Sequence, residues 1–128
     1  ILKESLKKDF RYMIKQRGGM FAKGRLLGIQ FDTLFTDGLY EAICGEAVKK
    51  AMTLREAFLA KGISMYGSSM TNQQFPILTA AQKEALAKDF AFGYWGEAEE
   101  GKSIVRFCTS WATNDAQIKA LTDAIAAL

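Results

Sequence analysis

The sequence predicts an α+β fold in which helices cover one side of a small antiparallel sheet, with connector helices in front of it. Three observations support this prediction: apolar residues recur at helical spacing in the first half, alternate in short runs afterwards, and return to helical spacing at the C-terminal end. The chain has 128 residues, 49% of them hydrophobic and 24% charged. These values are typical of one ordinary packed domain or of a piece of a larger protein.

Two helices hinged at a glycine pair are expected first. Apolar residues at helical spacing lead up to the break at Gly18 and Gly19, and a second stripe follows it. The stripes comprise Leu6, Phe10, Met13 and Ile14, then Leu27, Phe31, Leu34 and Phe35. We place a boundary near Phe35, so that residues 1–35 form a connector segment and residues 36–128 a small α+β domain.

The next helix is the most clearly marked element of the sequence. Asp37 is expected to cap it, and Lys61 and Gly62 to end it, because a cation suits the last turn and glycine readily becomes left-handed. Its apolar stripe is Leu39, Ile43, Ala47, Ala51, Leu54 and Phe58.

Short strands are expected after residue 62. Residues 63–66 form one strand and residues 74–78 another, with Pro76 favouring an edge position because proline has no N–H to donate. Thr79 and Gln82 form a capping-box pattern that opens a short helix reaching about Lys88.

The last part of the sequence predicts a hairpin and a helix. Alternating aromatic residues from Phe90 to Tyr94, a polar turn over 96–102 and alternation over 103–108 indicate two antiparallel strands. Thr113 is expected to cap the final helix. The stripe of that helix is Ile118, Leu121, Ile125 and Leu128.

The composition excludes several kinds of chemistry. The chain contains no His, which removes the commonest proton shuttle and zinc ligand. Its two cysteines, Cys44 and Cys108, fit no CxxC spacing, so we expect reduced thiols and no metal site.

Neither a signal peptide nor a membrane span is indicated by the sequence, and the cytoplasm is the expected location. The chain starts at Ile1 in an apparently running helix, so we expect a fragment of a longer polypeptide.

Arg106 is the most informative polar residue of the strand over 103–108. It lies on the same face as Ile104 and Cys108, opposite Val105 and Phe107. A guanidinium among apolar strand residues costs several kcal/mol unless it is paired. Three readings of Arg106 are therefore open: a structural ion pair with a carboxylate of the protein, an exposed position at a sheet edge, or a carboxylate that arrives with a ligand.

Other polar and aromatic groups leave alternatives open. Residues 1–25 hold eight basic and two acidic side chains, although the formal net charge is only +3. Near the glycine hinge, this block is either a solvated helix face or an anion site able to hold a phosphate. The run over 71–74 either orients a ligand or closes a turn, and the aromatic residues from Phe90 to Trp95, with Trp111, either line a pocket or form core.

Three stretches give the sequence a family resemblance: residues 8–25 (KDFRYMIKQRGGMFAKGR), residues 37–40 (DGLY) and residues 106–113 (RFCTSWAT). In this order they resemble the C-terminal portion of low-specificity threonine aldolases, which belong to the β-eliminating lyase group of pyridoxal-phosphate enzymes. The resemblance implies the small C-terminal domain of the aspartate aminotransferase fold, fold type I, preceded by the last helices of the large cofactor domain.

The resemblance also implies roles for individual residues. Arg106 matches the arginine that binds the α-carboxylate of the substrate, and Lys15 and Lys23 lie at or beside basic positions that help to hold the cofactor phosphate. The Schiff-base lysine of the family lies upstream of residue 1, as does the histidine that stacks on the cofactor ring. No catalytic residue is therefore expected here, and this fragment by itself is expected to be inactive and not to bind pyridoxal phosphate.

The function implied for the full-length protein is cleavage of a β-hydroxy amino acid, L-threonine or L-allo-threonine, to glycine and acetaldehyde. The implied partners are the missing N-terminal cofactor domain and further copies of the protein, as a dimer or tetramer. The nearest alternative is a β-eliminating lyase of the tyrosine, tryptophan or cysteine type. A second alternative is a non-enzymatic module that uses the basic N-terminal block, but its acidic residues and the low net charge argue against nucleic-acid binding.

Overall fold

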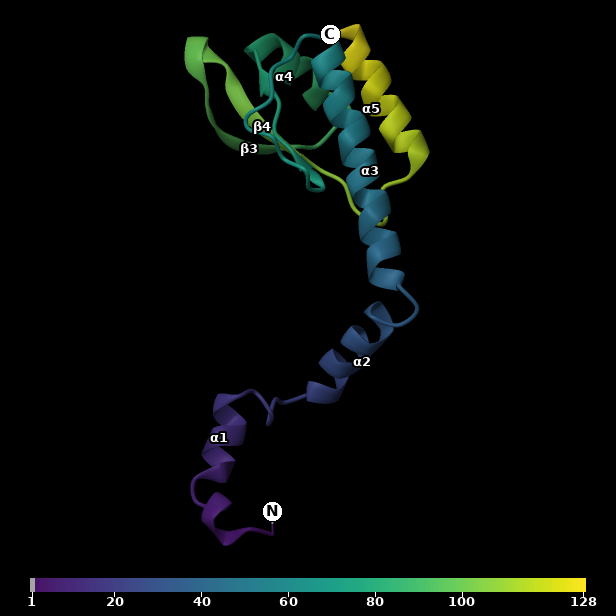
Figure 1. Ribbon diagram of the computed structural model, residues 1–128. Helices are drawn as coiled ribbons and strands as arrows, with labels where there is room; N and C mark the ends of the chain where they lie inside the picture. Colours follow the sequence, from purple (N-terminus) through teal and green to yellow (C-terminus); the bar gives the residue numbers. More distant parts are fainter. Residues whose placement is uncertain (1) are drawn as a thin grey trace. The chain divides into compact units, whose positions relative to one another are not determined.

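The computed structural model describes residues 2–128, and Ile1 lies outside the described residues (Figure 1). The chain divides into two compact units, one ending at Tyr40 and the other comprising Glu41–Leu128. We call them the N-terminal unit and the C-terminal unit.

The N-terminal unit consists of a short 3-10 helix, η1 (Glu4–Leu6), and two α-helices, α1 (Phe10–Gln16) and α2 (Gly24–Leu34). The sequence predicts a continuous first helix, and this prediction is wrong. Asp9 adopts a left-handed conformation with φ of 56° and separates η1 from α1. The break at the glycine pair is present. A Cβ atom on Gly19 would lie 2.9 Å from Cγ2 of Ile14, closer than real Cβ contacts come, so the backbone there requires glycine.

A long helix, α3 (Leu39–Ala60), leads into the C-terminal unit (Figure 1). Asp37 does not occupy its cap position. It is left-handed, with φ of 53°, and Gly38 with φ of 70° separates it from the helix. The other end agrees with the sequence, because Gly62 follows the helix with φ of 79°.

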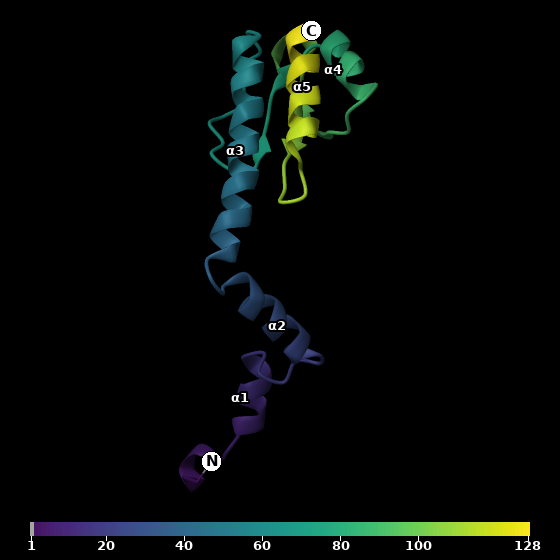
Figure 2. The same cartoon turned by 90° about the vertical axis from the view of Figure 1, so that its right-hand side faces the viewer.

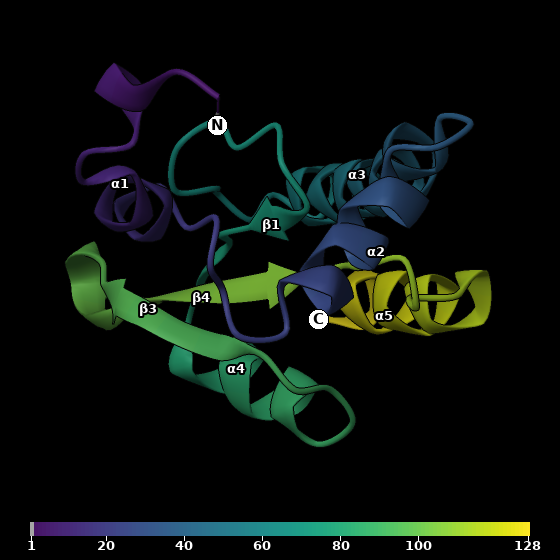
Figure 3. The ribbon, with the colours of Figure 1, turned by 90° about the horizontal axis from the view of Figure 1, so that it is seen from below.

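Four short strands form the sheet: β1 (Gln73–Gln74), β2 (Ile77–Leu78), β3 (Gly93–Glu97) and β4 (Ser103–Cys108). β4 is central and antiparallel to all the others, with β3 along one side and β1 and β2 along the other (Figure 3). The predicted hairpin is thus present as β3 and β4. A β-bulge lies between Tyr94 and Gly96.

We expected Pro76 at the edge of the sheet, and this prediction is wrong, because Pro76 has a partner on each side. Its carbonyl accepts a hydrogen bond from Val105 N at 3.1 Å, and on its other side it pairs with Met65. The missing N–H divides the expected strand over 74–78 into β1 and β2. The strand expected over 63–66 is reduced to this bridge, with hydrogen bonds from Tyr66 N to Phe75 O and from Ile77 N to Ser64 O.

The core lies on one face of the sheet, under α3, α4 (Ala80–Ala87) and α5 (Asp115–Ala127) (Figure 2). The ring of Phe58 on α3 meets that of Phe107 on β4, with centroids 5.5 Å apart. The buried members of this cluster are Leu54, Phe58, Ile63, Leu78, Leu86, Val105, Phe107, Leu121 and Ile125. The stripes expected for the third and the last helix supply most of the helical members.

Both short helices of the C-terminal unit begin with capping boxes. For α4 the predicted pair is confirmed: Gln82 N donates to Thr79 Oγ1 at 3.2 Å, and Thr79 N donates to Gln82 Oε1 at 3.0 Å. For α5 the predicted cap, Thr113, is wrong. Asn114 caps the helix and exchanges two 2.9 Å hydrogen bonds with Gln117. Within the described part of the chain, none of the helices has the length and apolar character needed to cross a membrane.

Candidate functional site

Arg106 projects from the middle of the central strand, on the face of the sheet that the helices do not cover. Its neighbours along β4, Val105 and Phe107, belong to the core cluster, and successive strand residues point to opposite faces. Arg106 is half-buried and lies directly opposite Gly93 of β3. The alternation predicted from the sequence thus places the guanidinium opposite the core.

The guanidinium of Arg106 has no protein carboxylate beside it. Among residues 2–128, none of the ion pairs within 4.0 Å includes Arg106. Its Cζ atom lies instead 5.5 Å from the ring centroid of Trp95, which is within the range of a cation–π interaction. Of the three readings left open by the sequence, the internal ion pair is therefore not formed within the described residues, and β4 is not an edge strand.

One further aromatic contact lies next to Arg106. The ring of Phe75, between β1 and β2, lies 5.0 Å from that of Trp95 on β3. Since these segments flank β4 on opposite sides, the two rings meet across the central strand. Neither Phe75 nor Gly93 was expected at this site, because only strand pairing brings Gly93 beside Arg106 and Phe75 against Trp95.

The aromatic residues over 90–95 divide between the core and the surface. Phe92 packs on Phe107 at 5.0 Å, and Phe90 also packs against the core. Tyr94, Trp95 and Trp111 are instead exposed. The expectation that these aromatic residues form core therefore holds only for the two phenylalanines.

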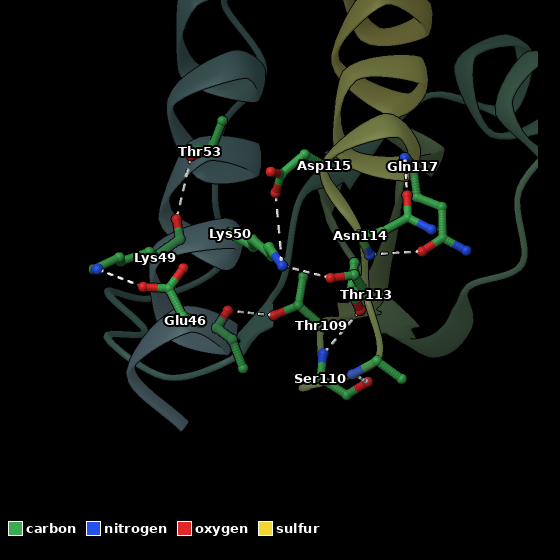
Figure 4. A network of polar contacts seen from close by, with 12 residues as sticks. Glu46, Lys49, Lys50, Thr53, Thr109, Ser110, Thr113, Asn114, Asp115 and Gln117 are labelled. Atoms are coloured by element: carbon green, nitrogen blue, oxygen red, sulfur yellow. Dashed lines mark hydrogen bonds and ion pairs between the residues drawn. The ribbon is translucent and has the colours of Figure 1, made fainter. Parts of the chain in front are cut away.

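The segment that follows Arg106 is tied to α3 by polar contacts (Figure 4). The buried hydroxyl of Thr109 donates to Ala47 O at 2.7 Å. Lys50 donates to Thr113 O and lies 3.6 Å from Asp115. The turn between them is closed by a hydrogen bond from Ser110 N to Thr113 Oγ1 at 2.9 Å. This network holds the TSWAT segment against α3, directly after the strand that bears Arg106.

The polar run over 71–74 closes a turn. Gln73 N donates to Thr71 Oγ1, and the side chain of Gln74 donates to the carbonyl of Thr71. Asn72 Nδ2 donates to Thr109 O at 2.7 Å and so joins this turn to the end of β4. These contacts indicate a structural role for the run.

A cavity of about 620 Å³ lies at the other end of the hairpin, and Arg106 is not among its lining residues. Glu97, Glu99 and Glu100 line it together with Lys102. The ion pair with Lys102 lowers the pKa of Glu100, and a hydrogen bond to Glu97 raises the pKa of the nearby Tyr94. We place the candidate site at Arg106, a half-buried cation of the central strand that has no protein carboxylate beside it among residues 2–128.

Lys15 and Lys23 lie at the two ends of the glycine-containing loop of the N-terminal unit. Lys15 is in the last turn of α1, and Lys23 directly precedes α2 in a left-handed conformation with φ of 62°. Both side chains are exposed. Their arrangement leaves the two cations available to an anion.

Cys44 is a half-buried free thiol and Cys108 an exposed one. Over residues 2–128, no three His, Cys, Asp or Glu side chains are grouped so that they could hold a metal ion.

The chain is similar in fold and sequence to a solved structure of the threonine aldolase of Leishmania major. The two share 37% sequence identity with a TM-score of 0.83, over 99% of this chain and 37% of the other. No protein-family model matches the sequence. The curated proteins contain no match either.

The sequence and the fold therefore agree on one class of protein. The resemblance to the C-terminal region of threonine aldolases is confirmed, and the α+β fold matches a part of such an enzyme. The chain spans little more than a third of the length of the enzyme it matches.

Proposed function

We propose that this chain is the C-terminal part of a pyridoxal-phosphate-dependent amino-acid lyase and binds the α-carboxylate of the substrate through Arg106. The reaction proposed for the whole protein is that of a threonine aldolase, which cleaves L-threonine or L-allo-threonine to glycine and acetaldehyde. The similarity to the Leishmania major threonine aldolase supports the reaction. The observation that carries the role of this chain is the unpaired guanidinium of Arg106.

The chemistry of Arg106 suits a carboxylate. A guanidinium presents its N–H donors in a planar fork, which forms two parallel charge-assisted hydrogen bonds to a carboxylate. Arg106 is half-buried, and within residues 2–128 no Asp or Glu competes for those donors. Such a pair fixes the orientation of the amino acid and thereby determines which of its Cα bonds is aligned for cleavage.

Lys15 and Lys23 fit the phosphate of the proposed cofactor. They are exposed cations on either side of a loop that contains Gly18 and Gly19. When bound, pyridoxal phosphate supplies an electron sink for the bond cleaved at Cα. The Schiff-base lysine is proposed to lie outside this chain, which would then contribute binding and orientation only.

The remaining parts of the proposal concern organisation. Residues 1–35 are proposed to complete the cofactor domain and connector, and residues 36–128 to form the small domain. We propose a cytoplasmic homo-oligomer, either a dimer or a tetramer. β-Elimination on another amino acid remains the second candidate, because it would use the same arginine for the same carboxylate.

Replacement of Arg106 in the full-length protein tests the proposal. Arg106→Ala should raise the KM for the amino acid at least about 100-fold, because two hydrogen bonds to a charged group are lost. Lys102→Ala, which removes a cation from the same hairpin, should leave KM within about 2-fold. An unchanged KM in Arg106→Ala would remove the proposed role.

Analysis of the products of the full-length protein distinguishes the two candidate reactions. Glycine and an aldehyde indicate aldol cleavage, whereas pyruvate and ammonia indicate β-elimination.

A further inference from the structure

A guanidinium that binds a carboxylate through two hydrogen bonds has to be held in one orientation before the ligand arrives. The arginine side chain is long and loses considerable rotamer entropy when it is fixed. Within residues 2–128, Arg106 has neither an ion pair nor a hydrogen bond from its side chain to do this. The contacts that restrict it are those with the neighbouring strand.

Gly93 and Trp95 supply these contacts. A Cβ atom at Gly93 would lie 3.8 Å from both Nε and Nη2 of Arg106, so the side chain of Arg106 lies over Gly93 of the neighbouring strand. Cζ of Arg106 lies 5.5 Å from the centroid of Trp95. The attraction of a cation to an aromatic face uses no N–H donor, and therefore all the donors of Arg106 remain available to a carboxylate.

The position of Trp95 is itself determined by two features. It is the extra residue of the β-bulge between Tyr94 and Gly96, and bulges commonly redirect a side chain. Its ring rests against Phe75, 5.0 Å away and tilted by 58°, which reaches over β4 from the opposite side. Trp95 is 51% exposed, so burial alone does not account for a tryptophan at this position.

We propose that Trp95, supported by Phe75, is a positioning residue that holds the guanidinium of Arg106 in the orientation that receives the substrate carboxylate. This inference rests on the proposed role of Arg106. It adds a second residue, on a different strand, that sets the affinity for amino acids and leaves the cleavage step itself unchanged.

A double-mutant cycle in the full-length enzyme tests the inference. Trp95→Leu, which removes the aromatic face, should raise KM about 3- to 30-fold with kcat little changed, while Trp95→Phe should stay within about 3-fold of wild type. If Trp95 acts through Arg106, Trp95→Leu should alter kcat/KM less than about 2-fold in an Arg106→Ala background. Tyr94→Leu removes an exposed ring from the same strand and is the matched control, with KM unchanged.

Glycine binding measured by calorimetry gives a readout that does not depend on turnover. Its affinity should fall in Trp95→Leu by the same factor as KM rises. Phe75→Leu provides a second variant should Trp95→Leu fail to fold, with a smaller loss of affinity that also disappears in the Arg106→Ala background.

The outcomes separate this inference from the proposed function. An unchanged KM in Trp95→Leu, an equal loss in the Arg106→Ala background, or a loss in Trp95→Phe as large as in Trp95→Leu would overturn the role of Trp95 while leaving that of Arg106 intact. An unchanged KM in Arg106→Ala would overturn both.

Discussion

The two units of the chain handle their apolar residues in opposite ways. In the C-terminal unit, three helices and four strands bury a common cluster that includes Phe58, Leu86 and Val105. In the N-terminal unit, neither α1 nor α2 contains a buried residue. Its exposed large apolar side chains include Leu26, Leu27, Ile29, Phe31 and Phe35.

The two units also differ in how their helices begin. α4 and α5 begin with complete capping boxes, whereas α1 and α2 begin after left-handed residues, Asp9 and Lys23, without a side-chain cap. α1 has 7 residues and α2 has 11, and isolated helices shorter than about 12–15 residues are marginal in water. Apolar residues at helical spacing therefore indicate a helix with an apolar face. They do not show that the same segment contains the core that buries this face.

The largest expected effect comes from separating the units. Residues 39–128 alone should unfold cooperatively in urea, because their core is internal, whereas residues 2–38 alone should show little helix by circular dichroism and no cooperative transition. A cooperative transition in the shorter piece, or its absence in the longer one, would contradict the comparison.

Substitutions at two neighbouring positions of α3 test which of its side chains belong to the core. Phe58→Ala should lower the free energy of unfolding by about 3–5 kcal/mol, because it removes a fully buried ring that packs on Phe107. Leu59→Ala, at the next position, removes a side chain that is 49% exposed and should cost less than about 1 kcal/mol. Urea unfolding of residues 39–128 measures both, and equal losses would show that the core is misplaced.

The smallest expected effect concerns the caps. Asn114→Ala should cost about 1 kcal/mol, because Gln117 N loses its acceptor at the start of α5. Asp9→Asn in the N-terminal unit should leave the unfolding transition of the chain unchanged, since Asp9 makes no side-chain cap bond and both residues tolerate the left-handed conformation. A loss in Asp9→Asn comparable to that in Asn114→Ala would remove the distinction between the two units.

The fold was largely predictable because its signals are local. The stripe of α3, the capping box of Thr79 and the β3–β4 hairpin each depend on residues close together in the sequence. The errors arose where neighbouring candidates compete: Thr113 and Asn114 both suit a cap, and the structure uses Asn114 while Thr113 closes the preceding turn. Pro76 was misplaced because strand order is not a local property.

The candidate site was predictable only in part. Alternation along residues 103–108 placed Arg106 opposite Val105 and Phe107, and the family resemblance singled it out. Whether a protein carboxylate neutralises it depends on which side chains the sheet brings beside it. Trp95 and Phe75 are distant from Arg106 in the sequence and from each other, so no spacing rule connects them.

The sequence by itself determined the helices, the hairpin and the resemblance to threonine aldolases, because periodicity, caps and motifs are written along the chain. The tertiary structure alone decided that β4 is central, that Gly93 lies beside the side chain of Arg106, and that two aromatic rings meet across that strand. These features arise from antiparallel pairing, which joins residues by register and independently of their separation in the chain.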